Sequence, residues 1–167
     1  GAKNVALTAE LADGWLPLFF LPERAGEVFG PALAEGSARR PGTLAPLEVC
    51  AGGVAYIGEA DTARAMLDTY ARPILALYIG GMGARGKNFY NDLVRRYGYE
   101  AEAEQIQELY LSGRKREAAA CVPEDLLQLT NLCGTPAFVR ERVDAFRDAG
   151  VTLLNTMPVG PDPVGTL

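Results

Sequence analysis

Three short features of the sequence could take part in chemistry. Asp13 is a carboxylate between an Ala-rich segment and an apolar run, Gly80–Gly83 is a glycine-rich turn, and Arg114–Arg116 is a basic triplet. A carboxylate can act as a general acid or base, and glycine-rich loops or basic runs can bind phosphate. Each feature also has a structural explanation. Asp13 would satisfy a turn, the glycines would end a helix without the Lys-Ser or Lys-Thr of a nucleotide loop, and the triplet would be solvated.

The sequence excludes several kinds of catalysis because it contains no histidine. Ser-His-Asp and Cys-His arrangements, and zinc sites that need imidazole, cannot be built within this chain. Its three cysteines, Cys50, Cys121 and Cys133, cannot all pair with one another, and none forms a Cys-x-x-Cys motif. We therefore expect reduced thiols, a cytoplasmic protein and no structural metal.

The net charge of −5, from 16 basic and 21 acidic residues, makes nucleic acid and anionic membranes poor candidates as partners. No apolar run approaches the roughly 20 residues that a membrane-spanning helix needs. The chain start also lacks the charged, apolar and small-residue pattern of a signal peptide. We expect neither nucleic acid nor a membrane as a partner.

Apolar spacing and the positions of glycine and proline predict an alternation of helices and strands. The expected strands lie at residues 15–20, 47–57 and 151–156. The expected helices lie at residues 5–13, 22–36, 61–79, 88–132 and 136–149. Because proline lacks an N–H group, Pro31 and Pro73 should break or kink their helices. The segment 88–132 should be divided at Gly98, Gly113 and Val122-Pro123.

Two local patterns predict details of these elements. Gly52 and Gly53 lie inside the second strand, where paired glycines indicate a bulge or a close approach of another backbone. Thr135 precedes Pro136, which is the typical arrangement of an N-cap followed by the first helical residue. We therefore expect the last helix to begin at Pro136.

The alternation predicts a parallel α/β sheet in a single domain, residues 1–167, with a helical insertion at 80–132. Three parallel strands cannot close a barrel, and as an open sheet they would expose apolar edges. The chain is therefore expected to be a piece of something larger or to complete itself by association. A homo-oligomer that associates through exposed strand edges is the expected partner arrangement.

Four segments, in chain order, resemble the luciferase-like flavin and deazaflavin oxidoreductases. They are Gly1–Trp15 (Gly-Ala-Lys-Asn, then Leu-Ala-Asp-Gly-Trp), Tyr78–Tyr90 (Tyr-Ile-Gly-Gly-Met-Gly, then Asn-Phe-Tyr), Leu132–Pro136 with the helix after it, and Asn155–Gly160. The subgroup it resembles most uses the deazaflavin coenzyme F-420. The resemblance implies the C-terminal part of a TIM (β/α)8 barrel about twice this length, holding about three strands with their helices.

The implied activity is hydride transfer between coenzyme F-420 and a small organic substrate. The alternatives are an FMN-dependent monooxygenase on the same fold, or a truncated, non-catalytic module that self-associates. The resemblance identifies no catalytic residue here, because the early strands that carry substrate and cofactor residues in the family have no counterpart in this sequence.

The resemblance also implies which residues bind the cofactor. Gly1, Ala2 and Lys3 match the turn that opens a helix near the cofactor's phosphate, although the family often has proline where Ala2 stands. Free N–H groups at a helix start attract phosphate, and Lys3 adds a positive charge. Leu18 and Phe19 end the first expected strand and Thr156 ends the last one, at the end of the sheet that faces the active site in a TIM barrel.

Overall fold

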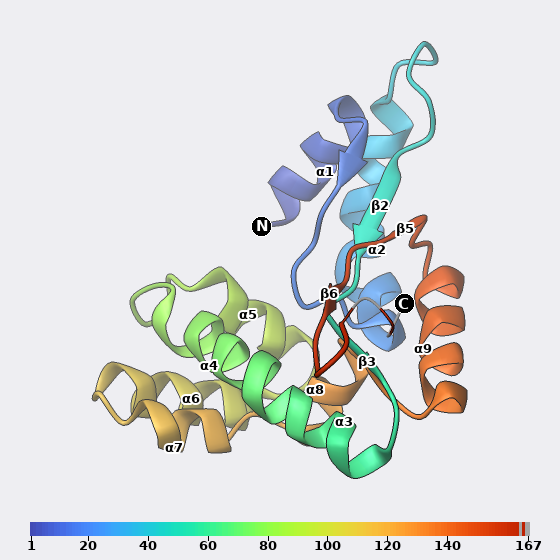
Figure 1. The fold of residues 1–167 in the computed structure, drawn as a ribbon. Helices are drawn as coiled ribbons and strands as arrows, with labels where there is room; N and C mark the ends of the chain where they lie inside the picture. Colours follow the sequence, from blue (N-terminus) through green and yellow to red (C-terminus); the bar gives the residue numbers. More distant parts are fainter. Residues whose placement is uncertain (164, 166–167) are drawn as a thin grey trace.

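In the computed structural model, residues 1–163 and 165 are described, and short parallel strands lie between two groups of helices (Figure 1). The strands are β1 (Gly14–Trp15), β2 (Glu48–Ala51), β3 (Val54–Ile57), β4 (Leu132–Gly134), β5 (Leu153–Leu154) and β6 (Met157–Pro158). The helices are α1 (Ala2–Leu11), α2 (Pro22–Arg39), α3 (Ala60–Met66), α4 (Arg72–Gly81), α5 (Phe89–Arg96), α6 (Glu100–Leu111), α7 (Lys115–Ala120), α8 (Glu124–Leu129) and α9 (Pro136–Asp148), and a π-helical turn, η1 (Leu67–Ala71), joins α3 to α4.

All strand pairs are parallel, in the orders β1-β2-β5 and β4-β3-β6. The chain 152–159 follows β2 and β3 along one edge without interruption, because the amides of Thr152, Asn155, Met157 and Val159 donate to the carbonyls of Val49, Ala51, Gly53 and Ala55 at 2.9–3.0 Å. Strands β1 and β4 therefore follow one another along the opposite edge. The predicted parallel α/β architecture is confirmed, with residues 48–57 as its central strand.

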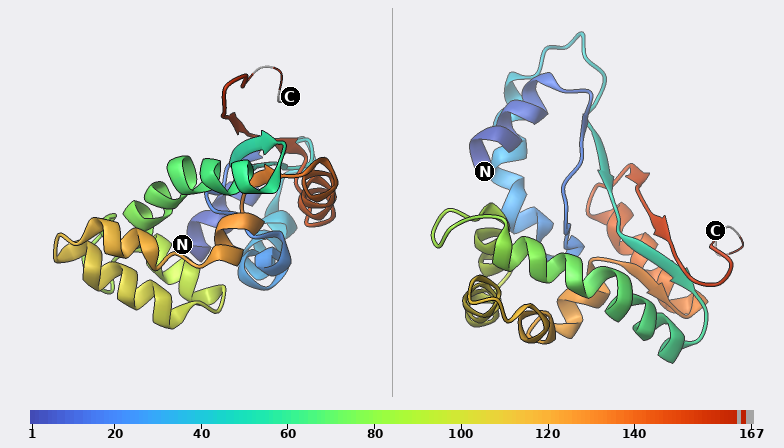
Figure 2. Two further views of the ribbon diagram at one scale, coloured as in Figure 1. Left: turned by 60° about the horizontal axis from the view of Figure 1, so that its bottom comes forward. Right: turned by 60° about the vertical axis from the view of Figure 1, so that its left-hand side comes forward.

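Helices cross the end of the sheet toward which the strands point. In the right-hand view of Figure 2, the run from α3 to α4 passes across the end of β3, while α1 and α2 lie toward the start of β2. In this run, α3 contacts β3 and β4, whereas residues 71–75 lie beside the interruption between β2 and β3. Among the described residues, no helix combines the length and apolar character needed to cross a bilayer.

The predicted helix ends are correct where glycine or a capping residue marks them in the sequence. Gly98 and Gly113 separate helices with φ values of +100° and +84°, and α9 begins at Pro136 with the Thr135 side chain accepting from the Phe138 amide. Of the two effects expected at Pro31, a break or a kink, the break does not occur, since α2 runs from Pro22 to Arg39. Pro31 is exposed there, and the buried face of α2 against the core holds the helix together despite the lost hydrogen bond.

The strand predictions are correct in position and too long. The strand expected at 15–20 ends at Trp15, because Pro17 cannot donate to a ladder and the chain turns away after it. The last strand is in two parts, and Thr156 lies between β5 and β6 instead of at a strand end. Strand β4 was not expected, since a three-residue strand leaves little apolar periodicity to detect.

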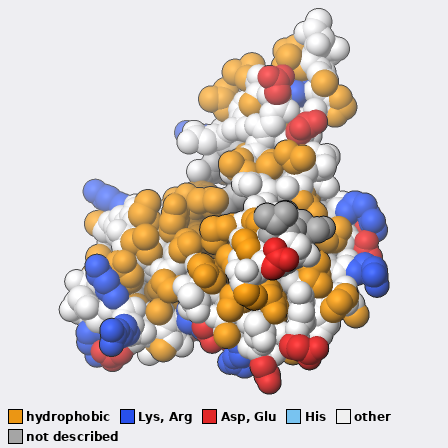
Figure 3. All heavy atoms as spheres, viewed as in Figure 1, with side chains coloured by type: hydrophobic (Ala, Val, Ile, Leu, Met, Phe, Trp, Pro, Cys, Tyr) orange, Lys and Arg blue, Asp and Glu red, His pale blue; other side chains and the backbone are white. Residues whose placement is uncertain are grey.

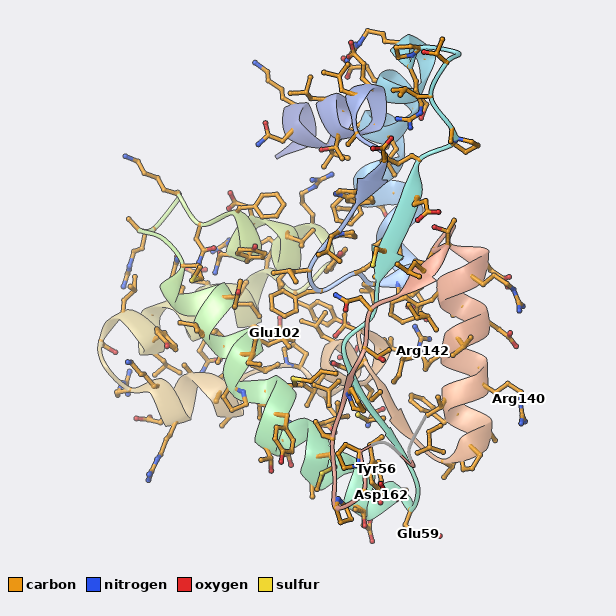
Figure 4. All side chains as sticks on the ribbon, turned by 45° about the horizontal axis from the view of Figure 1, so that its top comes forward. Tyr56, Glu59, Glu102, Arg140, Arg142 and Asp162 are labelled. Carbon is orange, nitrogen blue, oxygen red and sulfur yellow. The ribbon has the colours of Figure 1, made fainter. Side chains whose placement is uncertain are left out.

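A buried arginine joins α9 to the start of α2. Arg142 is 3% exposed, forms a two-pronged ion pair with Glu23, and donates to the Leu129 carbonyl at 2.9 Å. In Figure 4, Arg142 lies on the inner side of α9, whereas Arg140 points away from the molecule. The guanidinium thus fixes three elements that do not follow one another in the chain.

The central strand is interrupted at Gly52 and Gly53 because other chain segments pass very close to it. A Cβ atom on Gly52 would lie 2.4 Å from the Asn155 carbonyl oxygen, and one on Gly53 would lie 2.4 Å from Asn131 Oδ1 and 2.8 Å from the Thr130 carbonyl oxygen. The predicted close backbone approach is confirmed at both glycines.

We expect Gly53→Ala to lower the free energy of unfolding by about 1–3 kcal/mol, because the new methyl group overlaps backbone that cannot move freely. Gly42→Ala is the matched control: that loop position has open space around its Cβ and should change stability by less than about 0.5 kcal/mol. Urea denaturation measures both. Equal midpoints for the two variants would contradict the close approach.

Candidate functional site

A cavity of about 200 Å³, named cavity 1 here, opens at the interruption of the central strand, between the carboxyl ends of β2 and β5 and the amino ends of β3 and β6. The loop after β1, the interruption between β2 and β3, the link between β5 and β6, and the helical segment 71–75 form its walls. Its lining residues are Leu18, Phe19, Gly52, Gly53, Val54, Ala71, Ile74, Leu75, Thr130, Asn131, Asn155, Thr156 and Met157. With Thr130 and Asn131 before β4, the cavity is therefore built where four segments of the sheet and one helical segment converge.

Three of the six residues predicted from the sequence meet in cavity 1. Leu18, Phe19 and Thr156 all line it, although they lie in connecting segments and not at strand ends. Within the described part of the chain, the Thr156 hydroxyl makes no hydrogen bond to protein, so it is free to contact a ligand. The three residues come from opposite ends of the sequence, and the parallel pairing of the sheet brings them together.

The other three predicted residues lie around the start of α1. Gly1 lines a second cavity of about 370 Å³, cavity 2, to which α1, the loop after β1 and α5 contribute. Leu18 lines both cavities, so they adjoin at this side chain. Ala2 and Lys3 are exposed in the first turn of α1, which has no acidic residue, and among the described residues Lys3 forms no ion pair.

The lining of cavity 1 contains no ionisable side chain. Its walls are aliphatic and aromatic carbon with a few hydroxyl, amide and backbone polar groups. Such a surface can bind a planar ring and exclude water from it, but it cannot give or take a proton. The part of the site that this chain supplies is thus suited to binding and orientation.

The other chemical candidates in the sequence have structural roles. Asp13 is exposed, and its backbone carbonyl accepts from the Glu48 amide at 2.9 Å, which joins the α1 turn to β2. Helix α4 ends at Gly81, and Gly80 and Gly81 allow the Tyr110 ring to approach closely. Arg114 is exposed and pairs with Glu117 at 3.4 Å. None of these features lines either cavity.

Sequence reasoning missed Asn131, which lines cavity 1 and holds its floor. Its Oδ1 accepts from the Val54 amide at 2.8 Å, and its Nδ2 donates to the Leu127 carbonyl at 2.7 Å. The side chain is 4% exposed. The Asn131 side chain thus supplies the hydrogen-bond acceptor that a neighbouring strand would otherwise offer the Val54 amide. No local sequence pattern predicts this role, since Asn131 and Val54 lie 77 residues apart in the chain.

Comparison with known proteins assigns the chain to a family. The model of the luciferase-like monooxygenase family matches residues 1–153.

The chain belongs to the luciferase-like monooxygenase family. A protein of Mycobacterium tuberculosis with the provisional name of a coenzyme F-420-dependent oxidoreductase is 41% identical over 157 residues, which is 92% of this chain and 44% of that protein.

The structure of a coenzyme F-420-dependent tetrahydromethanopterin reductase from Methanopyrus kandleri matches 98% of this chain and 44% of its own, with a TM-score of 0.70 and 23% identity. The predicted fold class is confirmed: the α/β fold matches part of a TIM-barrel reductase. The chain spans less than half the length of both relatives.

The cysteines of this family member take no part in the cavities. Among the described residues, no group of three Cys, Asp or Glu side chains is placed to hold a metal ion. Cys133 is 4% exposed, its thiol donates to the Val54 carbonyl at 3.3 Å, and burial raises its pKa to about 12. Cys50 and Cys121 are partly exposed and unpaired.

These environments predict a selective reaction with a thiol reagent. At pH 8, iodoacetamide should alkylate Cys50 and Cys121, and it should reach Cys133 only after unfolding, because the thiolate is the reacting species and Cys133 stays protonated. Raising the pH to 10 should not change this, since the folded-state pKa lies higher still. Peptide mass mapping distinguishes the three sites, and early labelling of Cys133 would contradict its burial.

We expect Asn131→Ala to lower the free energy of unfolding by about 1–3 kcal/mol, because the Val54 amide is left buried without an acceptor. Asn4→Ala is the matched control, since the Asn4 side chain is exposed and makes no hydrogen bond within the described residues. Thermal and urea unfolding would reveal the difference. If both variants were as stable as the parent chain, Asn131 would not support the strand interruption.

Proposed function

We propose that this chain forms the C-terminal part of a coenzyme F-420-dependent oxidoreductase that transfers a hydride between the coenzyme and a small organic substrate. The observation that carries the proposal is the convergence of Leu18, Phe19 and Thr156 on an uncharged cavity at the interruption of the parallel strands. The 41% identical relative, whose name includes the same coenzyme, supports this choice.

The two adjoining cavities fit the two chemical parts of such a coenzyme. Leu18 and Phe19 would pack against the flat ring in cavity 1 and exclude water, and the Thr156 hydroxyl would offer one hydrogen bond. The phosphate-bearing tail would pass Leu18 toward the start of α1. There, the first-turn amides near Gly1 and the positive charge of Lys3 would face it.

The bound coenzyme supplies the hydride chemistry, so this part of the protein needs to bind, orient and desolvate it. The absence of ionisable groups from the lining of cavity 1 agrees with that division. Any proton transfer would fall to the substrate or to residues outside the lining of cavity 1. FMN-dependent monooxygenation is the second candidate, because the description of the family model names a monooxygenase.

Self-association is a further part of the proposal. Figure 3 shows hydrophobic side chains gathered on the face that α4 shares with the last strands. The exposed apolar residues of these elements include Ile74, Leu77, Leu153, Leu154 and Met157. A surface of this kind favours burial against another protein surface, either a second copy or further parts of a barrel.

Titration of coenzyme F-420 with the chain, followed by the fluorescence of the coenzyme, tests the proposal. We expect saturable quenching, and weaker binding of FMN in a parallel titration. Lys3→Ala should weaken binding of F-420 about three- to tenfold, because it removes one charge near the phosphate. Lys115→Ala removes the same charge from α7, whose residues line neither cavity, and should leave affinity unchanged.

The outcomes separate the candidates. Equal or tighter binding of FMN would overturn the choice of F-420 and favour the monooxygenase. If neither cofactor bound, the non-catalytic module would be the better description of this chain. If Lys3→Ala and Lys115→Ala weakened binding equally, the start of α1 would not be the phosphate site.

A further inference from the structure

Phe19 has an unusual backbone at the wall of cavity 1. Its φ is +55°, and no other non-glycine residue among those described has a positive φ. The left-handed region is rarely occupied by a bulky aromatic residue, because its Cβ crowds the neighbouring carbonyl. Such a conformation persists only where surrounding contacts hold it.

A buried tyrosine supplies one of those contacts. The Tyr97 hydroxyl, at the end of α5, donates to the Phe19 carbonyl oxygen at 3.0 Å. Tyr97 is 3% exposed, and burial raises its pKa, so the hydroxyl keeps its proton and stays a donor. The bond joins residues 78 positions apart and fixes the orientation of the peptide that follows Phe19.

Aromatic contacts hold the Phe19 ring. Tyr78 of α4 and Tyr90 of α5 meet it edge to face at centroid distances of 5.2 Å and 5.8 Å, and they contact each other at 4.7 Å. Buried Asn88 keeps the two tyrosines in place. Its side chain donates to the carbonyls of Tyr78 and Ile79 at 2.9–3.0 Å and accepts from the Tyr90 amide at 3.0 Å.

The left-handed residue marks the point where the chain leaves the cavity wall and enters the core. Leu18 is 41% exposed and lines both cavities, whereas Phe20 and Leu21 are each 2% exposed. With an ordinary negative φ at Phe19, Leu18 and Phe20 could not both keep these positions. The strain is therefore tied to the placement of the ligand-facing side chains.

We infer that Tyr97 is a positioning residue: by holding Phe19 in its left-handed conformation, it sets the wall formed by Leu18 and Phe19 that a ligand of cavity 1 contacts. The helical segment after α4 thereby contributes to ligand binding without lining cavity 1. The identity of the ligand rests on the proposed function, while the positioning of Phe19 does not.

Tyr97→Phe removes the hydroxyl and keeps the ring, and Tyr99→Phe is its matched control. Tyr99 lies two residues away and donates to Asp125 Oδ2 at 2.8 Å, and it lines neither cavity. Backbone NMR chemical shifts of residues 18–20 depend on φ and ψ and therefore respond to a change of conformation at Phe19. We expect a positive φ at Phe19 in the parent chain and in Tyr99→Phe, and a negative or averaged φ in Tyr97→Phe.

Ligand affinity gives the second readout. In the F-420 titration, Tyr97→Phe should weaken binding about tenfold, while Tyr99→Phe should bind like the parent chain; tenfold corresponds to about 1.4 kcal/mol. An unchanged positive φ at Phe19 in Tyr97→Phe would overturn the inference, and so would an altered φ with unchanged affinity. If the parent chain bound no cofactor, the proposed function would fail, and the NMR shifts would still decide the positioning of Phe19.

A glycine variant covers the case in which Tyr97→Phe is poorly folded. Glycine adopts a positive φ without strain, so in a Phe19→Gly background the loss of the Tyr97 hydroxyl should cost less than half the unfolding free energy that it costs in the parent chain. Equal costs in both backgrounds, measured by urea unfolding, would show that Tyr97 does not hold Phe19 in its strained conformation.

Discussion

The close approach of three chain segments at Gly52 and Gly53 is the constraint on which the rest of the structure depends. Asn155 passes on one side and Asn131 on the other, each too close for a side chain to fit. The ladder to residues 152–159 continues across this point, while the Val54 amide turns to the Asn131 side chain. The interruption therefore opens the floor of cavity 1 without separating the strands around it.

Helices α4, α5 and α6 are joined to one another beside this site by buried polar side chains. Asn88 caps α5 and closes the end of α4, and Asn91 donates to the carbonyls of Ile79 and Ala103 at 3.1 Å and 2.7 Å. Three helices thus share one hydrogen-bonded junction. The aromatic residues around Phe19 project from two of them, so the junction and the cavity wall form a continuous structure.

Local signals made much of the fold predictable. The helix ends at Gly98 and Gly113 and the start of α9 at Thr135 follow from the conformational freedom of glycine and from side-chain capping, which depend on neighbours in sequence. The φ of Phe19 and the role of Asn131 depend on contacts between residues more than 70 positions apart. No pattern within a short window contains them, although Gly52-Gly53 did indicate that something passes close by.

Pro31 and Phe19 show, in opposite ways, that tertiary contacts can outweigh local preferences. At Pro31, burial of one face of α2 outweighs a local cost, so the helix continues where the local rule favours a break. At Phe19, long-range contacts sustain a backbone that local sterics disfavour. Tertiary contacts decide both cases, but the consequences differ. The continuous helix preserves packing, whereas the strained residue at the cavity wall sets the orientation of the side chains that line the cavity. Because that wall carries no ionisable group, its geometry is what it can contribute to a reaction.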